Sequence, residues 1–166
     1  GDIYINSSPT GSNYSITGAA SLSGSTNNSH SNQPIGCYTL SASAPSGYSV
    51  SSISPSNYQC LSSGQTSKPS ISYTVNLSAN APSAWIQANS SDGPITIDYN
   101  STASIRWGSS NASSCDIYKN GSYWTSGTSN SGTSSGNLTG STTFSISCSG
   151  PGGSASASVT VNVRPQ

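Results

Sequence analysis

Short apolar clusters that alternate with small polar residues are the feature that most restricts what this chain can fold into. Each cluster is followed within roughly ten residues by Gly, Pro or Asn, which is the rhythm of strands and turns. No segment shows the three-to-four-residue apolar spacing of an amphipathic helix. The sequence therefore predicts an all-β protein, built as a sandwich or a barrel.

Strands are expected in both halves of the chain. The Asn120-Gly121 pair predicts a tight type I′ hairpin between the strands on either side of it, because Asn and Gly accept positive φ angles. Residues 126–140 are Ser, Gly, Thr and Asn apart from one Leu, and are predicted to form a long surface connection. The expected strands cover residues 2–7, 14–17, 36–42, 48–53, 58–61, 70–77, 84–89, 95–99, 103–107, 114–119, 121–125, 142–147 and 156–163.

The segment from Leu77 to Ser83 is the predicted domain boundary. It follows one alternating strand and precedes a fresh strand that contains Trp85. The cut gives an N-terminal domain of residues 1–78 and a C-terminal domain of residues 79–166. Domains this small bury little surface, so we expect help from disulfides, glycans or association with other copies.

The four cysteines agree with this cut, since two precede it and two follow it. Four cysteines allow three connectivities, and only one of them respects the boundary. A zinc site is a poor alternative, because no two cysteines form a C-x-x-C pair and His30 is the single histidine. Each bridge would close a loop of roughly 20 to 35 residues and stabilise its domain by about 3 to 4 kcal/mol. The expected pairs are Cys37 with Cys60 and Cys115 with Cys148.

Residues 102–107, 109–115 and 142–163 carry a resemblance to a known family. Their most specific part is Cys-Ser-Gly-Pro-Gly-Gly at 148–153, which precedes an alternating strand of Ala and Val. This half resembles the immunoglobulin-like repeats of large bacterial secreted and surface proteins. In those repeats the paired cysteines staple the sheets, which the resemblance implies for Cys115 and Cys148. One departure from antibody domains is that Trp107 precedes both cysteines instead of lying between them.

The first half is a looser match. Residues 36–40 and 45–48 look like parts of small surface β-modules of the PEGA and immunoglobulin-like kinds. The two resemblances together imply two tandem immunoglobulin-like β-sandwich domains. They also imply a spacer, adhesive or assembly role, although a fold alone does not select among these.

Charge is scarce and balanced, with 5% charged residues and a net charge of zero. The chain therefore lacks the basic surface that nucleic acid requires. No run of about 18 apolar residues occurs, so we expect no membrane insertion. No signal segment opens the chain, and we expect a mature form or a fragment of an extracellular protein, in line with an even number of cysteines in a Ser-rich and Asn-rich sequence.

The parts of a catalytic site are missing from the sequence. His30 lies in the polar segment 27–33 and is expected to be a solvated loop residue. No nucleophile elbow accompanies the acids, and the loop at residues 91–93 offers calcium a single carboxylate. We expect no enzyme activity, no metal and no cofactor. The acids considered are Asp2, Asp92, Asp98 and Asp116.

Aromatic residues must build much of the core, because the chain has one Phe and no Met. Trp107 lies on an alternating strand and is predicted to be buried. Tyr123 and Trp124 are strand neighbours, so they must point to opposite faces, and one of them is expected at the surface. A surface platform that includes Trp85 would bind sugars, which is a weaker interpretation of the same residues.

Covalent glycans are a further expectation. Nine asparagines stand in Asn-x-Ser/Thr sequons, where chance would give roughly five. The many Ser and Thr hydroxyls add O-linked candidates, and a hydroxyl-rich surface with few charges would gain solubility from a sugar coat. The candidate sites are Asn6, Asn13, Asn27, Asn76, Asn89, Asn100, Asn111, Asn120 and Asn137.

The first strand has two interpretations. Ile3 and Ile5 point to one face and Tyr4 to the other, as in any alternating strand. The simpler interpretation makes it the first strand of its own domain. The sharper one makes it an assembly strand that completes the sheet of a neighbouring copy, and such a head-to-tail contact builds a filament.

The sequence thus predicts a non-enzymatic structural subunit of an extracellular, glycosylated filament or surface layer. Its expected partners are copies of itself and covalent glycans. The alternative is a carbohydrate-binding or adhesive module of a larger secreted protein, and a third, weaker interpretation is an accessory domain of an extracellular hydrolase.

Overall fold

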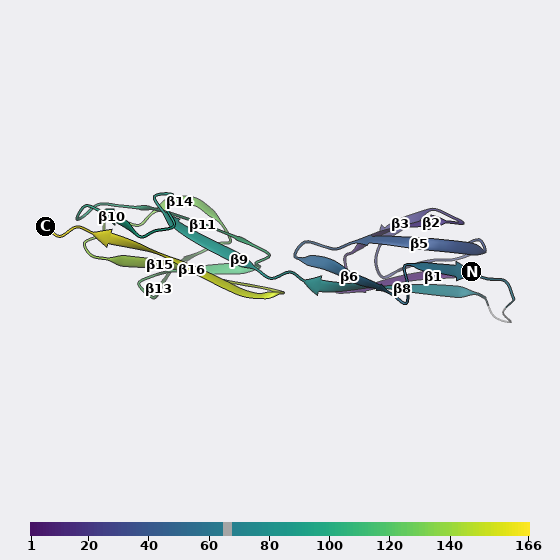
Figure 1. Cartoon of the computed structure of the whole chain (residues 1–166). Helices are drawn as coiled ribbons and strands as arrows, with labels where there is room; N and C mark the ends of the chain where they lie inside the picture. The colour runs from purple at the N-terminus through teal and green to yellow at the C-terminus, as the bar shows by residue number, and fades with distance from the viewer. Residues whose placement is uncertain (65–67) are drawn as a thin grey trace. The chain divides into compact units, whose positions relative to one another are not determined.

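The computed structural model describes residues 1–64 and 68–166 and forms two compact all-β units (Figure 1). Unit 1 is Gly1–Ala79 and unit 2 is Asn80–Gln166. The cut expected after residue 78 lies one residue from this division. The described residues contain no helix long and apolar enough to cross a membrane.

Unit 1 is a sandwich of two four-stranded sheets, with the orders β4-β1-β8-β6 and β3-β2-β5-β7. Alternation explains the packing, because in β8 Ile71, Tyr73 and Val75 are buried while the residues between them face outward. These side chains meet Tyr38 and Leu40 of the opposite sheet in one core. The strands are β1 (Asp2–Ser8), β2 (Asn13–Gly18), β3 (Leu22–Ser25), β4 (Asn28–His30), β5 (Gly36–Ser43), β6 (Tyr48–Ser54), β7 (Tyr58–Leu61) and β8 (Ser70–Ala79).

Unit 2 is also a two-sheet sandwich, with the orders β10-β16-β15-β12-β13 and β14-β11-β9. The run β16-β15-β12-β13 is the G-F-C-C′ order of an immunoglobulin variable domain, so this unit has the expected immunoglobulin-like architecture. The strands are β9 (Ser83–Ala88), β10 (Ile95–Ile97), β11 (Ser104–Ser110), β12 (Ser114–Lys119), β13 (Ser122–Ser126), β14 (Asn130–Ser134), β15 (Thr142–Gly150) and β16 (Gly153–Val163).

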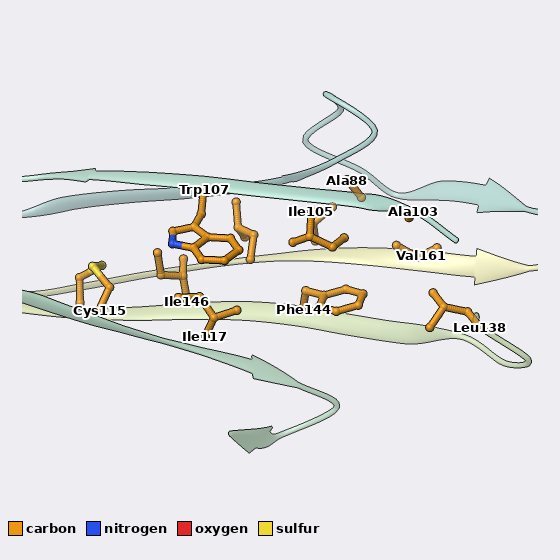
Figure 2. Close-up of a cluster of buried hydrophobic side chains, with 13 residues drawn as sticks. Ala88, Ala103, Ile105, Trp107, Cys115, Ile117, Leu138, Phe144, Ile146 and Val161 are labelled. Atoms are coloured by element: carbon orange, nitrogen blue, oxygen red, sulfur yellow. A yellow bond between two sulfur atoms is a disulfide. The ribbon is translucent and has the colours of Figure 1, made fainter. Parts of the chain in front are cut away.

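Trp107 anchors the core of unit 2. It points from β11 toward Ile117, Phe144 and Ile146 of the facing sheet (Figure 2). Its Nε1 donates a hydrogen bond to the Gly127 carbonyl oxygen at 2.9 Å, so the polar edge of the ring is satisfied. The prediction that Trp107 is a core residue is confirmed by its 2% exposure.

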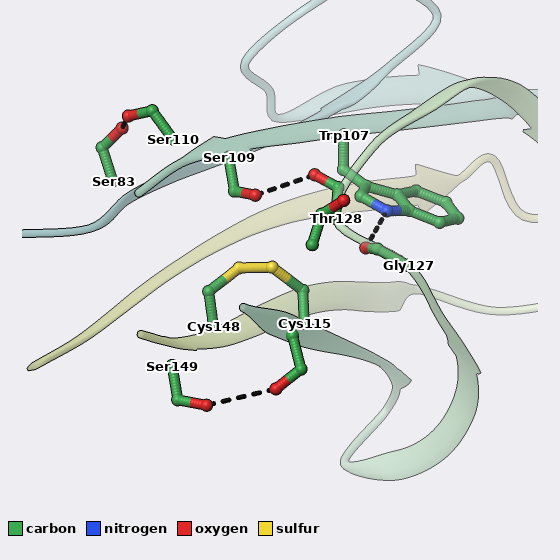
Figure 3. The surroundings of a disulfide bond; sticks show 10 residues. Ser83, Trp107, Ser109, Ser110, Cys115, Gly127, Thr128, Cys148 and Ser149 are labelled. Atoms are coloured by element: carbon green, nitrogen blue, oxygen red, sulfur yellow. Dashed lines mark hydrogen bonds between the residues drawn. A yellow bond between two sulfur atoms is a disulfide. The ribbon is translucent and has the colours of Figure 1, made fainter. Parts of the chain in front are cut away.

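Both disulfides are present, Cys37–Cys60 and Cys115–Cys148, but neither joins two sheets. Cys115 of β12 and Cys148 of β15 are directly opposite each other on adjacent antiparallel strands, with Cα atoms 4.0 Å apart (Figure 3). Cys37 and Cys60 face each other in the same way on β5 and β7. The expectation that the cysteines staple the sheets together is therefore wrong, because each bridge lies within one sheet.

Two further predictions need correction. Residues 126–140 are not a plain connection, because they contain β14, which pairs with β11. His30 is not a solvated loop residue, because it ends β4 and its Nε2 lies 2.7 Å from the hydroxyl of the buried Tyr14. Both segments are polar strands whose pairing comes from neighbours distant in sequence, so no local alternation of apolar residues announces them.

Two local predictions in unit 2 are confirmed. Asn120 and Gly121 have φ angles of 49° and 80° between β12 and β13, which confirms the type I′ hairpin. Tyr123 is 62% exposed, while Trp124 packs against the core, so the predicted split of this pair is confirmed.

Candidate functional site: the slot around the first strand

The first strand lies in the interior of a sheet. It pairs in parallel with β8 over seven residues, from Asp2 opposite Ser70 to Ser8 opposite Asn76. On its other side it pairs antiparallel with β4. The side chains of Ile3 and Ile5 are fully buried, whereas 43% of Tyr4 is exposed. The predicted faces of this strand are confirmed, and in this structure the strand completes its own unit.

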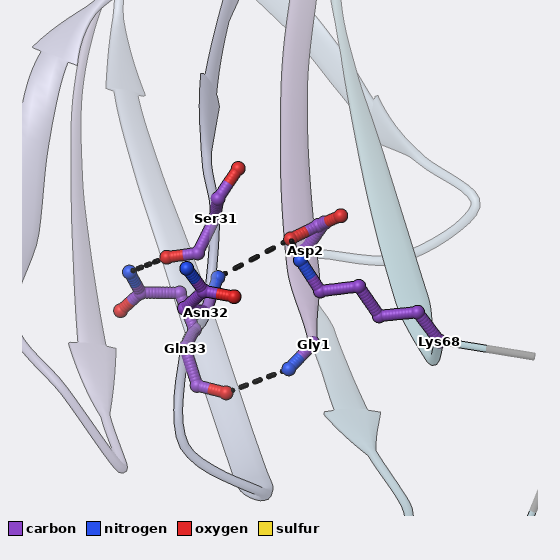
Figure 4. A network of polar contacts seen from close by, with 6 residues as sticks. All are labelled: Gly1, Asp2, Ser31, Asn32, Gln33 and Lys68. Atoms are coloured by element: carbon purple, nitrogen blue, oxygen red, sulfur yellow. Dashed lines mark hydrogen bonds and ion pairs between the residues drawn. The ribbon is translucent and has the colours of Figure 1, made fainter.

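Polar contacts fix the beginning of the strand (Figure 4). The Gly1 nitrogen donates to the Gln33 carbonyl oxygen at 2.8 Å, and the Gln33 amide donates back to the Gly1 carbonyl oxygen. The Asp2 amide donates to the Pro69 carbonyl oxygen at 2.9 Å. A methyl group on Gly1 would lie 2.6 Å from that oxygen and 2.7 Å from Leu61 Cδ2, so the slot fits glycine closely. Backbone hydrogen bonds from residues on both sides of β1 thus hold the first two residues of the strand in place.

An ion pair lies at the same end. Lys68 Nζ donates to Asp2 Oδ1 at 2.7 Å, and the Asn32 amide donates to the same oxygen at 3.2 Å. Hydrogen bonding to Lys68 lowers the pKa of the Asp2 carboxyl below its ordinary value of 3.8, and this outweighs the opposing effect of burial. The carboxylate therefore holds β1 to a residue just before β8.

The other end of the strand is held by hydroxyl and amide groups. The Ser7 hydroxyl lies 2.6 Å from the Thr26 hydroxyl and donates to the Pro9 carbonyl oxygen at 2.9 Å. The Ser7 amide donates to Asn27 Oδ1 at 3.1 Å. Ser12, in the connection to β2, has a buried hydroxyl oxygen with no hydrogen-bond partner among the described residues. The connection is thus short and polar, and it adds no apolar anchor to β1.

Acid should loosen β1 in this slot. A carboxyl whose pKa is lower in the folded than in the unfolded chain stabilises the fold above its ordinary pKa, and this contribution is lost as the pH falls through the folded value. We expect the free energy of unfolding of unit 1 to decrease as the pH drops below about 4. This decrease should be smaller in the Asp2→Asn variant. Urea unfolding at pH 6 and at lower pH would measure the difference, with Asp92→Asn as the control because that carboxylate is exposed and belongs to unit 2. An unchanged pH profile for Asp2→Asn would contradict the assigned role.

Within residues 1–64 and 68–166, no group of three or more His, Cys, Asp or Glu is placed to hold a metal ion. Asp98 pairs with Arg164, and Asp92 accepts a hydrogen bond from Gln87 Nε2 at 2.9 Å. The hydroxyl of Tyr14 receives a hydrogen bond from Asn28 Nδ2, while burial raises the pKa of Tyr14. These contacts tie strands and turns together.

Most of the asparagines in sequons occupy positions where the backbone conformation itself favours asparagine. Five have positive φ angles, which Asn tolerates better than other residues with a side chain. They are Asn27, Asn89, Asn100, Asn111 and Asn120. Asn76 is half-buried and donates to two serines of β6. Asn13 and Asn137 are exposed and hydrogen-bonded to side chains. Asn6, on the outer face of β1, is exposed. Turn geometry therefore accounts for much of the excess of Asn, and glycosylation stays a prediction.

Comparison with known proteins gives remote similarities of fold. No protein-family model matches the chain, and no curated protein matches its sequence. The fibronectin(III)-like modules of Clostridium thermocellum CbhA are 12% identical, with a TM-score of 0.37 over 92% of this chain and 78% of that one. BcpA, the major pilin subunit of Bacillus cereus, is 9% identical, with a TM-score of 0.35 over 99% and 68%. The four N-terminal Ig domains of Dscam1 isoform 8.4 are 10% identical, with a TM-score of 0.39 over 93% and 38%.

Proposed function

We propose that this chain is a non-enzymatic structural subunit of an extracellular homopolymer, in which β1 of one copy fills the slot between β4 and β8 of the next. The observation that carries the proposal is the position of β1. Both of its partner strands are distant in sequence, so no hairpin ties β1 to either of them. The same contacts can therefore be made within one copy or between two.

Exchange of β1 between two copies would preserve nearly all of the contacts of the strand. A β1 from a second copy would bury the same Ile3 and Ile5 and would meet the same backbone groups at Gln33 and Pro69. What changes is the short connection before β2, which must extend instead of turning back. Exchange of an identical element is a low-cost route to association, and a head-to-tail pattern does not close on itself. The oxidising compartment that the two disulfides imply agrees with an extracellular assembly.

Thiol pairs across the slot would test the exchange. Tyr4 and Ser72 are opposite each other on β1 and β8, and both face outward. In the double variant Tyr4→Cys and Ser72→Cys, a short thiol-specific crosslinker should link consecutive copies of the polymer and give a covalent ladder on a denaturing gel. The control is Ser54→Cys with Thr74→Cys, an exposed pair on β6 and β8, which should crosslink within one copy and give no ladder.

The same double variant provides the converse experiment. Crosslinking it in dilute solution, before assembly, should lock β1 in its own unit and abolish filaments in electron micrographs, while circular dichroism shows an intact fold. Filaments that still form from the locked chain would contradict the proposed strand exchange. If the unmodified chain stays monomeric at every concentration tested, the proposal of a homopolymer is wrong.

A different observation favours the alternative, an adhesive or carbohydrate-binding module. Trp85 keeps 40% of its surface exposed on the outer face of unit 2, in a chain with only three tryptophans. Exposed aromatic rings of this kind stack on sugar rings. Saturable sugar binding by the monomer would support this function in place of the homopolymer.

A further inference from the structure

The charged side chains of this protein are nearly all occupied by partners within the chain. Three of the four cationic groups have a protein acceptor, namely Lys68 with Asp2, Arg164 with Asp98, and Lys119 with the Ser135 carbonyl oxygen at 2.9 Å. Arg106 is different, because in the described part of the chain its guanidinium contacts the ring of Trp85 and has no acceptor for its N–H groups. Its donors are therefore available to a ligand from outside.

The Arg106 patch, defined as Arg106, Trp85 and Gly108, lies on the outer face of the sheet β14-β11-β9. Trp85 is directly opposite Gly108, and its ring occupies the space of a side chain there, since a Cβ would lie 2.7 Å from three ring atoms. The Arg106 guanidinium carbon lies 5.2 Å from the ring centroid. A surface hollow of about 350 Å³ adjoins both side chains and is rimmed by residues 129–131. The cation is thus held in place by an aromatic ring beside open space.

One carboxylate is likewise without a partner in the described chain. Asp116 is exposed on β12, whereas the other three carboxylates are bound by Lys68, Arg164 or Gln87. Tyr118 lies two residues further along the same face and forms an edge-to-face pair with Tyr123, with ring centroids 6.3 Å apart. We call Asp116, Tyr118 and Tyr123 the Asp116 patch.

The two patches are complementary in charge and similar in composition. Each combines one unpartnered charge with an exposed aromatic group. Arg106 lies two residues from the position opposite Trp85, and Asp116 lies two residues from Tyr118. In both patches the charge and the aromatic position therefore lie on one face of the sheet. Ser and Thr cover much of the surrounding surface and impose no competing charge.

We propose that the Arg106 patch of one copy binds the Asp116 patch of a second copy, an inference that rests on the proposed homopolymer and assigns it a lateral contact. The guanidinium can hold the carboxylate with two N–H groups while its face stays against Trp85. The patches lie on the outer faces of the two opposed sheets of unit 2. The contact is therefore heterologous, and its repetition gives an open array of subunits.

Charge reversal would test the contact. We expect Arg106→Asp and Asp116→Arg, each alone, to raise the concentration at which half of the full-length chains associate by at least about tenfold, because each variant sets like charges against one another. An equimolar mixture of the two variants should restore association, since every contact between unlike copies again joins Arg to Asp. Sedimentation velocity would measure association, and circular dichroism would verify that each variant is folded.

The outcomes separate this contact from strand exchange. Chains with β1 locked in its own unit should form only short oligomers, detected by sedimentation and not as filaments, and these oligomers should show the same loss and rescue because unit 2 is unchanged. Loss in either single variant without rescue in the mixture would overturn the proposal. An anionic glycan as the true ligand would appear as saturable binding of polygalacturonate to the wild-type monomer, abolished by Arg106→Asp and unaffected by Asp116→Arg. Association equal to wild type in both single variants would also overturn the contact, and it would leave the homopolymer standing.

Discussion

Replacing Trp107 with alanine is expected to lower the free energy of unfolding of unit 2 by about 3 to 5 kcal/mol. The side chain is 2% exposed, and its ring centroid lies 6.3 Å from that of Trp124. The variant would leave a large cavity between the two sheets and would strip the Gly127 carbonyl of its hydrogen bond from the indole. Small domains are stable by about 5 to 15 kcal/mol, so much of the stability of unit 2 depends on this residue.

Trp85→Ala is the matched control for Trp107→Ala. Both side chains are tryptophans of the same sheet, but Trp85 is on its outer face and 40% exposed, so its loss should cost about 1 kcal/mol. Urea unfolding followed by circular dichroism would compare the two variants, with the transition of unit 1 as an internal reference. Equal losses for both would show that the core of unit 2 does not depend on the Trp107 ring.

The parts of the fold that the sequence predicted are those where burial alternates along one strand. From Ile71 to Val75 in β8 and from Phe144 to Cys148 in β15 every second residue is apolar and buried, so type and position could both be inferred. The strands β3, β4 and β14 are short and mostly polar, and they lie at sheet edges. Their structure comes from backbone hydrogen bonds to one neighbouring strand, and such pairing leaves no apolar period in the sequence.

The candidate site was predictable in part for the same reason. Alternation gave the faces of Ile3, Tyr4 and Ile5, but it carries no information on which strands lie on either side. The parallel partner β8 begins 68 residues after β1 begins, and Lys68 reaches Asp2 only because of that pairing. A contact of this range depends on the packing of the whole unit.

The disulfides show the same limit. Position relative to the domain cut was enough to suggest the pairs, but it could not show that each pair joins adjacent strands of one sheet. The faces also differ. Cys115 and Cys148 are 2% and 1% exposed and belong to the core of unit 2, whereas Cys60 is exposed on the outside of unit 1.

Replacing both cysteines of one bridge with alanine is expected to destabilise the unit that contains it and to leave the other unit unchanged. The bridges span sequence separations of 23 and 33 residues. Loops of this size correspond to about 3 to 4 kcal/mol in the chain-entropy model. Unit 2 should lose more than unit 1, because Cys115 and Cys148 also fill space in the core.

The two disulfides should also differ in the rate at which a reducing agent opens them, because they differ in solvent exposure. The double-alanine variants would not measure this rate. A reducing thiol must reach a sulfur atom, so the exposed Cys37–Cys60 bridge should open first under mild reduction, and Cys115–Cys148 should open only when unit 2 unfolds. Alkylation of released thiols at successive times, followed by peptide mapping, would record the order. Simultaneous release of all four thiols would contradict it, and would mean that neither unit keeps its core closed around its own bridge.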